Sequence, residues 1–489
     1  SMNRRTFLKA STFFTITGTL SSCATNPVTG SRDLVLLSED EETELGRNSH
    51  TQVMKSYRAY QDPHLLQYVT ELGEKLAIIS HRKELIYHFT VLDSPQVNAF
   101  AIPGGYVYVT RGMLAYLGSE AELAGVLGHE LGHITARHGV KQYSKNQVTS
   151  ILTTVFSIIV GNRQISNLSQ LATQAILRGF GREAELEADR IGADYIAKVG
   201  YNPEALQNVI GVLKNQEEFD KILAEEENRE PYAYHGIFST HPDNDKRLKE
   251  VISAAKKNIN KKKLGNNKKK YLSIIAGMPF GPGEGQGSSR GSNFYHRDLN
   301  FIVEFPKGWK IENLQNSILA TSKNREEVIE VTMRDLNRKI SAEELIKRLY
   351  GESYENGQEI NKYEYKGYAA TVKIDTSFGK SRKCRVAILY KNKKEAFHIL
   401  ATCKNKKNYE KKQYLFDKTI GSIRKLKEKE KKLGDSKKIV VYKVKKGDTY
   451  KKLSLKTAFS SHAENRLRVI NNMFPVGEPE PGSYIKLIY

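Results

Sequence analysis

The spacing of apolar residues divides the chain into a helical part followed by a part rich in strands. From 38 to about 272, apolar residues mostly recur every three or four positions, as on one face of a helix. Two short stretches in this part, 87–92 and 106–109, have the pattern of strands instead. From 300 to 426, short strands alternate with two helical segments, the first of which opens with a capping box at 341–344. The pattern predicts a mainly α domain with a small β-sheet, followed by an α/β domain.

Composition marks the boundaries between these parts. The 489 residues are too many for one compact core, and a glycine-rich stretch and a Lys/Glu-rich run interrupt the periodic segments. We therefore expect a helical domain, a Gly-rich linker, an α/β domain, a charged linker and a small C-terminal module at 38–272, 273–295, 296–428, 429–440 and 441–489.

The charge balance only slightly narrows the classes of molecule that could be a binding partner. The chain has 77 Lys and Arg against 55 Asp and Glu, a formal net charge of +22, which suits nucleic acid, an anionic membrane or an acidic polymer. The basic runs lie between periodic segments, where blocks of like charge are usually solvated. With 39% hydrophobic and 27% charged residues, the composition excludes a multi-span membrane protein and a fully disordered chain.

The first 23 residues resemble a bacterial export signal with a lipid attachment site. Two arginines precede an apolar stretch, 7–20, which is too short to span a bilayer. The sequence Leu-Ser-Ser-Cys that follows resembles a lipobox, in which Cys23 becomes the acylated first residue. We expect a signal peptide at 1–22, a lipidated tether at 23–37 and an exported protein, which argues against a nucleic-acid partner. The alternative is an uncleaved, buried N-terminal helix.

Two further cysteines, Cys384 and Cys403, lie in stretches that alternate like the two strands of a hairpin. Pairing these strands around the polar turn 392–395 at a constant index sum places Cys384 opposite Cys403 and Ile388 opposite Ile399. In an exported protein this register permits a disulfide between the two cysteines. The alternative is a pair of buried thiols.

The motif with the most specific chemistry is His129-Glu130-Leu131-Gly132-His133, inside a helical run. Positions i and i+4 point to one face of a helix, so both imidazoles can reach one metal ion. Glu130 lies beside them, where it can take a proton from a metal-bound water. Catalytic zinc takes three protein ligands, so a third ligand has to come from elsewhere in the chain.

The candidates for this third ligand lie downstream. His138 is about 180° round the helix from the first histidine, so we expect it to face away and to be structural. Glu185 and Asp189 are four residues apart on a second helix, so one can bind the metal while the other holds a ligand imidazole by its free N–H. The alternative is a salt-bridged surface face that includes Arg182 and Arg190.

Together these features resemble metallopeptidase family forty-eight, and within it the bacterial lipoprotein zinc proteases, a group of membrane-associated gluzincins. The resemblance covers residues 23 to about 250. The segments that carry it are Cys23–Gly30, Asn98–Gly105, His129–His138, Glu185–Asp189, and Ser239–Pro242 followed by Arg247.

The resemblance implies a role for each residue of the motif. One Zn²⁺ is expected on His129, His133 and Glu185. Glu130 is expected to be the general base, and Asp189 is expected to support a ligand imidazole.

Two further roles are implied for segments outside the zinc motif. A peptide substrate is expected to lie on an exposed strand by β-augmentation, along Asn98, Ala99, Phe100, Ala101, Gly104 and Gly105. An ordinary structural hairpin is the alternative. His241 follows an acidic stretch, and in similar proteins a histidine in this position approaches the zinc as an oxyanion donor or as a plug. The alternative is a loop histidine without such a role.

The remaining two parts resemble binding modules. The domain at 296–428 resembles the α/β sandwich of PsbP/Mog1-type proteins and contains no catalytic cluster in its sequence. Residues 441–489 resemble a LysM module, a strand-helix-helix-strand unit, on the segments 441–449, 466–472 and 481–487. LysM modules bind N-acetylglucosamine polymers, so peptidoglycan is the implied partner.

The resulting hypothesis is a zinc metalloendopeptidase of the bacterial cell envelope that hydrolyses misfolded or unassembled envelope polypeptides. Ala24, after the acylated Cys23, replaces the aspartate associated with inner-membrane retention, which favours a periplasmic lipoprotein anchored in the outer membrane. The alternative is a non-catalytic, peptidoglycan-associated lipoprotein that acts as a chaperone or scaffold.

Overall fold

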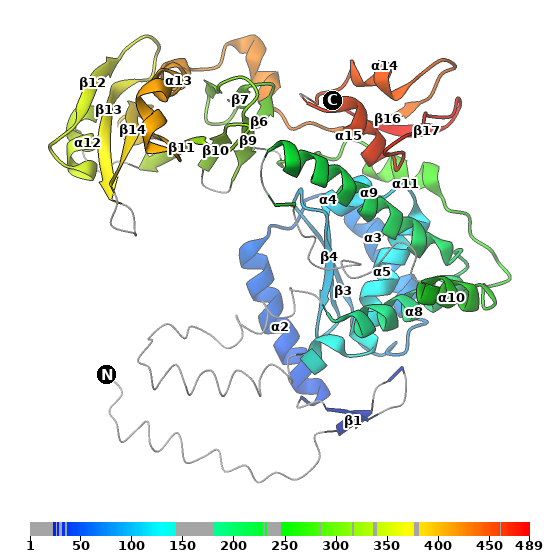
Figure 1. Cartoon of the computed structure of the whole chain (residues 1–489). Helices are drawn as coiled ribbons and strands as arrows, with labels where there is room; N and C mark the ends of the chain where they lie inside the picture. The colour runs from blue at the N-terminus through cyan, green and yellow to red at the C-terminus, as the bar shows by residue number, and fades with distance from the viewer. Residues whose placement is uncertain are drawn as a thin grey trace, which may run out of the picture.

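The computed structural model of the 489-residue chain describes residues 23–25, 27–28, 32–34, 37–142, 180–227, 230–231, 246–283, 285–314, 317–335, 340–375, 381–459 and 461–489. The predicted signal peptide and His241 lie outside the described residues. Figure 1 shows a helical domain around a small sheet, a second domain built on a large sheet, and a small C-terminal module beside the helical domain. No helix in the described part of the chain combines the length and apolarity that crossing a membrane requires.

The helical domain surrounds a three-stranded sheet with the order β3-β5-β4. β3 (His88–Leu92) runs parallel to β5 (Tyr106–Thr110), and β4 (Ala99–Ile102) pairs antiparallel with β5 at the edge. The helices are α2 (Glu39–Ser56), α3 (Pro63–Ala77), α4 (Arg111–Tyr116), α5 (Glu120–Thr135), α8 (Arg182–Val199), α9 (Glu204–Glu226), α10 (Lys246–Lys256) and α11 (Lys268–Ile275). The mainly α domain with a small sheet is therefore as the sequence predicts.

Helix α5 forms the centre of this domain, and all of its residues are buried. It begins after Ser119, whose side-chain oxygen accepts a hydrogen bond from the amide of Glu122. Helix α8 packs so closely on α5 that a Cβ atom on Gly192 would lie 2.8 Å from the backbone nitrogen of His129. A larger residue at 192 would push the two helices apart, so this glycine sets how near their side chains approach each other.

The second domain is a seven-stranded antiparallel sheet with a helix on each face. The strand order is β12-β13-β14-β15-β11-β10-β9. On β14, Ala387 and Leu389 contribute to the core under α13, whereas Val386 and Ile388 contribute to the core under α12. The elements are β9 (Lys310–Asn313), β10 (Ser317–Thr321), β11 (Glu327–Asp335), α12 (Ala342–Tyr350), β12 (Glu355–Ile360), β13 (Lys366–Asp375), β14 (Ser381–Tyr390), β15 (Glu395–Cys403), η1 (Lys406–Asn408) and α13 (Tyr409–Ser422).

The predicted disulfide between Cys384 and Cys403 is wrong, because the register of β14 and β15 differs by one residue from the expected one. Ile388 lies opposite His398. The turn closes on Glu395, whose carbonyl accepts hydrogen bonds from two amides of the turn. A shift of one residue reverses the face of every side chain, so Cys384 lies in the core under α12 and Cys403 in the core under α13. Both are buried free thiols.

Short elements occupy parts of both predicted linkers. β6 (Ser288–Arg290) and β7 (Asn293–His296) form a sheet with β8 (Phe301–Glu304), so the second half of the expected Gly-rich linker belongs to a folded unit. The expected charged linker contains most of the 3-10 helix η2 (Glu428–Gly434). Composition identified these stretches as linkers because such short elements carry no periodic pattern. Near the N-terminus, β1 (Cys23–Thr25) pairs antiparallel with β2 (Arg32–Leu34).

The C-terminal module has the predicted order of strand, helix, helix and strand. Thr449 caps the first helix by accepting a hydrogen bond from the amide of Lys452, and Asn471 follows the second helix. The elements are β16 (Ile439–Lys443), α14 (Tyr450–Ser454), α15 (Ala463–Ile470) and β17 (Tyr484–Ile488), and β16 pairs antiparallel with β17.

This module is not a separate body but shares the core of the helical domain. Ile485 and Leu487 belong to the same cluster of buried side chains as Leu117 and Tyr271. Helix α15 packs against α9 and α4 (Figure 1). The amide of Gly277, just after α11, donates to the carbonyl of Ile439, so β16 is attached to the helical domain from its first residue.

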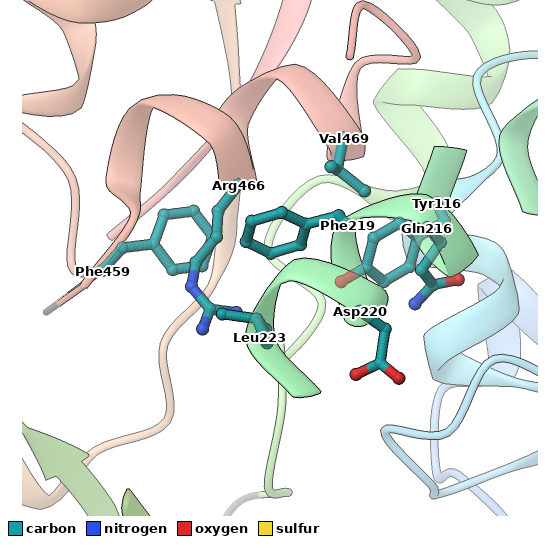
Figure 2. A pocket seen from close by; sticks show the side chains of 8 residues that line it. All are labelled: Tyr116, Gln216, Phe219, Asp220, Leu223, Phe459, Arg466 and Val469. Atoms are coloured by element: carbon teal, nitrogen blue, oxygen red, sulfur yellow. The ribbon is translucent and has the colours of Figure 1, made fainter. Parts of the chain in front are cut away.

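A pocket lies at the boundary between α9 and the C-terminal module (Figure 2). The Arg466 guanidinium lies between two aromatic rings, 5.4 Å from the ring centroid of Phe219 on α9 and 5.9 Å from that of Phe459. The ring of Phe219 also meets Phe474 edge-on, with the centroids 5.6 Å apart. Aromatic packing therefore joins the two parts at this boundary.

Candidate metal centre

Three side chains from two helices converge at the centre of the helical domain. The Nε2 atoms of His129 and His133, one turn apart on α5, are 3.0 Å from each other. Oε2 of Glu185, on the first turns of α8, is 3.1 Å from Nε2 of His129 and 3.5 Å from Nε2 of His133. All three side chains are buried. The ligand set that the resemblance implied is thus brought together.

The separations fit a single zinc ion. Two ligands about 2.0 to 2.1 Å from a tetrahedral zinc lie about 3.3 Å from each other, close to the distances between these three atoms. Among the described residues, no donor forms a well-aligned hydrogen bond with the buried Oε2 of Glu185, although two imidazole nitrogens face it. Two nitrogens and one carboxylate oxygen are also a donor set that zinc prefers.

Asp189 takes the supporting role. Its Oδ1 is 2.7 Å from Nδ1 of His129, the ring nitrogen that does not face the other two ligands. A carboxylate at this position fixes the tautomer of the imidazole, with the proton on Nδ1 and the lone pair on Nε2. Helix spacing alone left open which of Glu185 and Asp189 would join the two imidazoles, and the structure places Glu185 beside them, as the resemblance implied.

Buried charge dominates the electrostatics of the site. Burial raises the pKa of Glu130 to about 8, with Glu185 adding to this shift and His129 opposing it. Burial lowers the pKa of His133 to about 4, against the attraction of Glu185, which keeps this imidazole in the neutral form that binds metals. Burial also acts to lower the pKa of His129, but Asp189 and Glu185 outweigh it and raise the value to about 10. A divalent cation at this position would compensate the carboxylates of Glu185 and Asp189 and would lower the pKa of Glu130, so that Glu130 is ionised and can accept a proton.

Comparison with known proteins identifies a family whose model matches the part of the chain that contains this site. Residues 63–255, which contain all three candidate ligands, match the model of Peptidase family M48. The chain carries an M48 peptidase domain. Peptidases of this family depend on zinc, and the grouped side chains of His129, His133 and Glu185 are the site that would hold it.

The relatives match this domain rather than the whole chain. A Beta-barrel assembly-enhancing protease of Yersinia pestis is 31% identical over 229 residues, which cover 45% of this chain and 45% of that protein. The protein of the same name from Escherichia coli (strain K12) is 28% identical over 48% of each chain. The Mitochondrial metalloendopeptidase OMA1 of Arabidopsis thaliana is 33% identical over 36% of this chain and 33% of that protein. This chain thus spans less than half the length of these relatives.

Among solved structures, the cyanobacterial PsbP protein from Synechocystis sp. PCC 6803 is similar to part of this chain. The similarity covers 30% of this chain and 98% of that protein, with 12% sequence identity and a TM-score of 0.24. A score of this size carries no argument about ligand or activity.

The position of His138 in the M48 domain differs from the expected one. Its Nδ1 is 2.8 Å from Nδ1 of His133, so it faces the site instead of pointing away. The expectation assumed that the helix continues, but α5 ends at Thr135 and Arg137 has a φ of 57°. This left-handed residue turns the chain back and brings His138 under the second ligand histidine.

A buried carboxylate stabilises this turn, and sequence reasoning did not identify it. Glu42, on α2, accepts hydrogen bonds from Nε of Arg137 at 3.0 Å and from Nη1 of Arg82 at 2.8 Å. All three side chains are buried. Glu42 is one of four acidic residues in the first turn of α2, and nothing in the sequence marks it for such a contact, because its partners lie 40 and 95 residues away in the sequence.

The predicted substrate strand lies next to the site in the M48 domain. Three of the expected residues, Ala99, Phe100 and Ala101, lie on β4. The full list of the expected residues is Asn98, Ala99, Phe100, Ala101, Gly104 and Gly105. Among the described residues, β4 pairs only with β5, so its outer edge has no strand partner. The expectation of an exposed strand is wrong, however, because all four residues of β4 are buried. Ala101, Pro103 and Phe180 line a narrow cavity together with His133.

Proposed function

We propose that this chain is a zinc-dependent endopeptidase of the bacterial cell envelope that hydrolyses peptide bonds of misfolded or unassembled envelope proteins. The observation that supports it most is the convergence of His129, His133 and Glu185. Glu130 lies on the same helix as the two histidines. The relatives named Beta-barrel assembly-enhancing protease support the choice of substrate class, since their name refers to the assembly of β-barrels.

The residues of the chain divide the chemistry between them. When bound, zinc supplies a Lewis acid that polarises the peptide carbonyl and activates water. Glu130 accepts the proton of the attacking water and delivers it to the nitrogen of the leaving amine. His129 and His133 hold their lone pairs toward the centre, and Asp189 holds the proton of His129 on Nδ1. Burial of the centre excludes bulk water, which strengthens each of these interactions.

We further propose that the substrate adds to the edge of β4 that has no strand partner among the described residues, and that it does so as an extended strand. Main-chain hydrogen bonds along Ala99–Ile102 would bind a peptide with little dependence on its sequence. The position of Ala101 and His133 on one cavity supports this, because a peptide on that edge would pass close to His133. Such tolerance suits an enzyme that degrades unfolded chains. His241 remains a proposed oxyanion donor or plug.

The envelope location and the glycan partner are also proposals. Cys23 would be the acylated residue that anchors the protein in the outer membrane, and residues 441–489 would bind peptidoglycan. Sedimentation of the full chain with purified peptidoglycan tests the second proposal. If the protein stays wholly in the supernatant, the peptidoglycan proposal is wrong.

The variant Glu130→Gln tests the proposed chemistry. It keeps the size of the side chain but removes the proton acceptor, so we expect unchanged zinc content and a loss of cleavage of an unfolded outer-membrane protein by at least about a hundredfold. Glu44→Gln, an exposed glutamate on α2, is the control and should keep the parent rate. Cleavage by Glu130→Gln at the parent rate would contradict the assignment.

A further inference from the structure

We infer that His138 is a positioning residue: it orients the ligand imidazole of His133 and is itself held by the carboxylate of Glu187. The inference rests on the proposed function of the zinc site. Nδ1 of His138 is 2.8 Å from Nδ1 of His133, and Nε2 of His138 is 2.9 Å from Oε2 of Glu187 on α8. His133 and His138 are both at most 5% exposed, so no bulk water competes for the contact between the two rings, while Glu187 is partly exposed.

The protons of this relay can be placed by chemistry alone. A neutral imidazole that offers Nε2 to a metal carries its proton on Nδ1. His133 therefore donates from Nδ1, and Nδ1 of His138 has to be the acceptor. The proton of His138 is then on Nε2, where it is donated to the carboxylate of Glu187. Each contact has one donor and one acceptor, whereas the opposite tautomer of His138 would place a lone pair against the carboxylate.

The two ligand histidines are thus held by the same helix in two ways. His129 contacts Asp189 of α8 directly, at 2.7 Å. His133 reaches Glu187 of the same helix only through His138. The ring of Phe180 stacks on His133, with the centroids 4.4 Å apart, and restricts the ring plane. The sequence Glu185-Leu186-Glu187-Ala188-Asp189 would therefore supply one ligand and both of the carboxylates that orient the other two.

Zinc affinity of two variants of the full chain tests the relay. His138→Leu removes the acceptor for Nδ1 of His133, and we expect zinc to bind 10- to 100-fold more weakly in a competition with a chromogenic chelator. His138→Asn keeps an oxygen acceptor close to the position of Nδ1, so we expect less than tenfold weakening. His50→Leu is the control: it removes a histidine that contacts Tyr108 at 2.6 Å in the same domain, and it should bind zinc like the parent.

Thermal unfolding of the zinc-free proteins separates positioning from folding. We expect the zinc-free His138→Asn variant to unfold at the temperature of the zinc-free parent, so that its zinc affinity is interpretable even if His138→Leu folds poorly. Parent-like affinity of a folded His138→Leu, or equal weakening in both variants, would overturn the relay. A parent that cleaves and binds zinc alongside such a result would leave the proposed function standing, whereas a parent without zinc affinity would overturn both.

Discussion

The C-terminal module and the seven-stranded domain both follow the M48 match in the sequence, but they relate to it in opposite ways. Buried side chains of β16, β17, α14 and α15 belong to the core of the M48 domain. Within the described residues, the buried clusters of the seven-stranded domain draw only on residues 294 to 433. Proximity in the sequence therefore does not indicate which module is part of the peptidase, and the last residues of the chain complete its core.

One lysine marks the boundary between the M48 domain and the C-terminal module. Lys486, on β17, is 2% exposed, and its Nζ donates to the carbonyls of Ala115 at 2.6 Å and Leu117 at 2.7 Å. Burial lowers the pKa of this lysine, and the nearby carboxylate of Glu122 opposes the shift. A buried amine needs such acceptors, so the module can dock in this position and orientation only.

The largest effect is expected for Lys486→Met. This variant leaves two buried carbonyls without their donor and removes the positive charge near the buried Glu122, so we expect the free energy of unfolding of the M48 domain to fall by about 3 to 5 kcal/mol. Chemical denaturation followed by far-UV circular dichroism measures it. Lys443→Met, at an exposed position of β16, is the matched control and should change the stability little. An unchanged midpoint for Lys486→Met would show that the module is not part of this core.

A smaller effect is expected when the seven-stranded domain is acidified. Burial, with a contribution from Arg334, lowers the pKa of His398 to about 4, and Nε2 of this residue lies 2.5 Å from the hydroxyl of Tyr350. Below pH 6.5 the unfolded chain takes up a proton that the folded domain does not. The domain therefore loses stability as the pH falls from 6.5 toward 4, by about 2 kcal/mol at pH 5.

The single tryptophan reports this transition separately. Trp309 packs against the core of the seven-stranded domain, so its fluorescence follows this domain, while circular dichroism at 222 nm is dominated by the helices of the M48 domain. In His398→Phe, the dependence of the Trp309 transition on pH between 6.5 and 5 should decrease. If the parent and the variant show the same slope, His398 is not the residue responsible.

The smallest effect is expected at the rim of the boundary with the C-terminal module. Nε2 of His462 is 3.0 Å from Oε2 of Glu226, and both side chains are more than a quarter exposed. Water and salt screen such a pair, so Glu226→Gln should change the free energy of unfolding by less than about 1 kcal/mol. A loss as large as that of Lys486→Met would mean that the module is held by its rim rather than by its core.

The sequence was sufficient wherever function depends on a regular helix. The spacing of His129 and His133, and that of Glu185 and Asp189, predicted which side chains share a helix face, because helix geometry fixes it. His138 could not be placed in this way, since its position depends on a left-handed residue beyond the helix end.

The features that sequence reasoning missed share a physical cause. Glu42 holds the turn at Arg137, and Lys486 contacts carbonyls about 370 residues earlier, so neither has a local pattern. The register of Cys384 depends on one residue of a turn, and alternation alone does not count turn residues. Long-range contacts and turn geometry are thus where the structure adds to the sequence.

The most direct test of the central claim, that two helices hold one zinc ion through His129, His133 and Glu185, is the zinc content of Glu185→Ala after dialysis. Glu130→Gln, which keeps all three ligands, is the matched reference. The account predicts one zinc per chain in the parent and in Glu130→Gln, and a loss of most of the metal in Glu185→Ala. One tightly held zinc per chain in Glu185→Ala would contradict it.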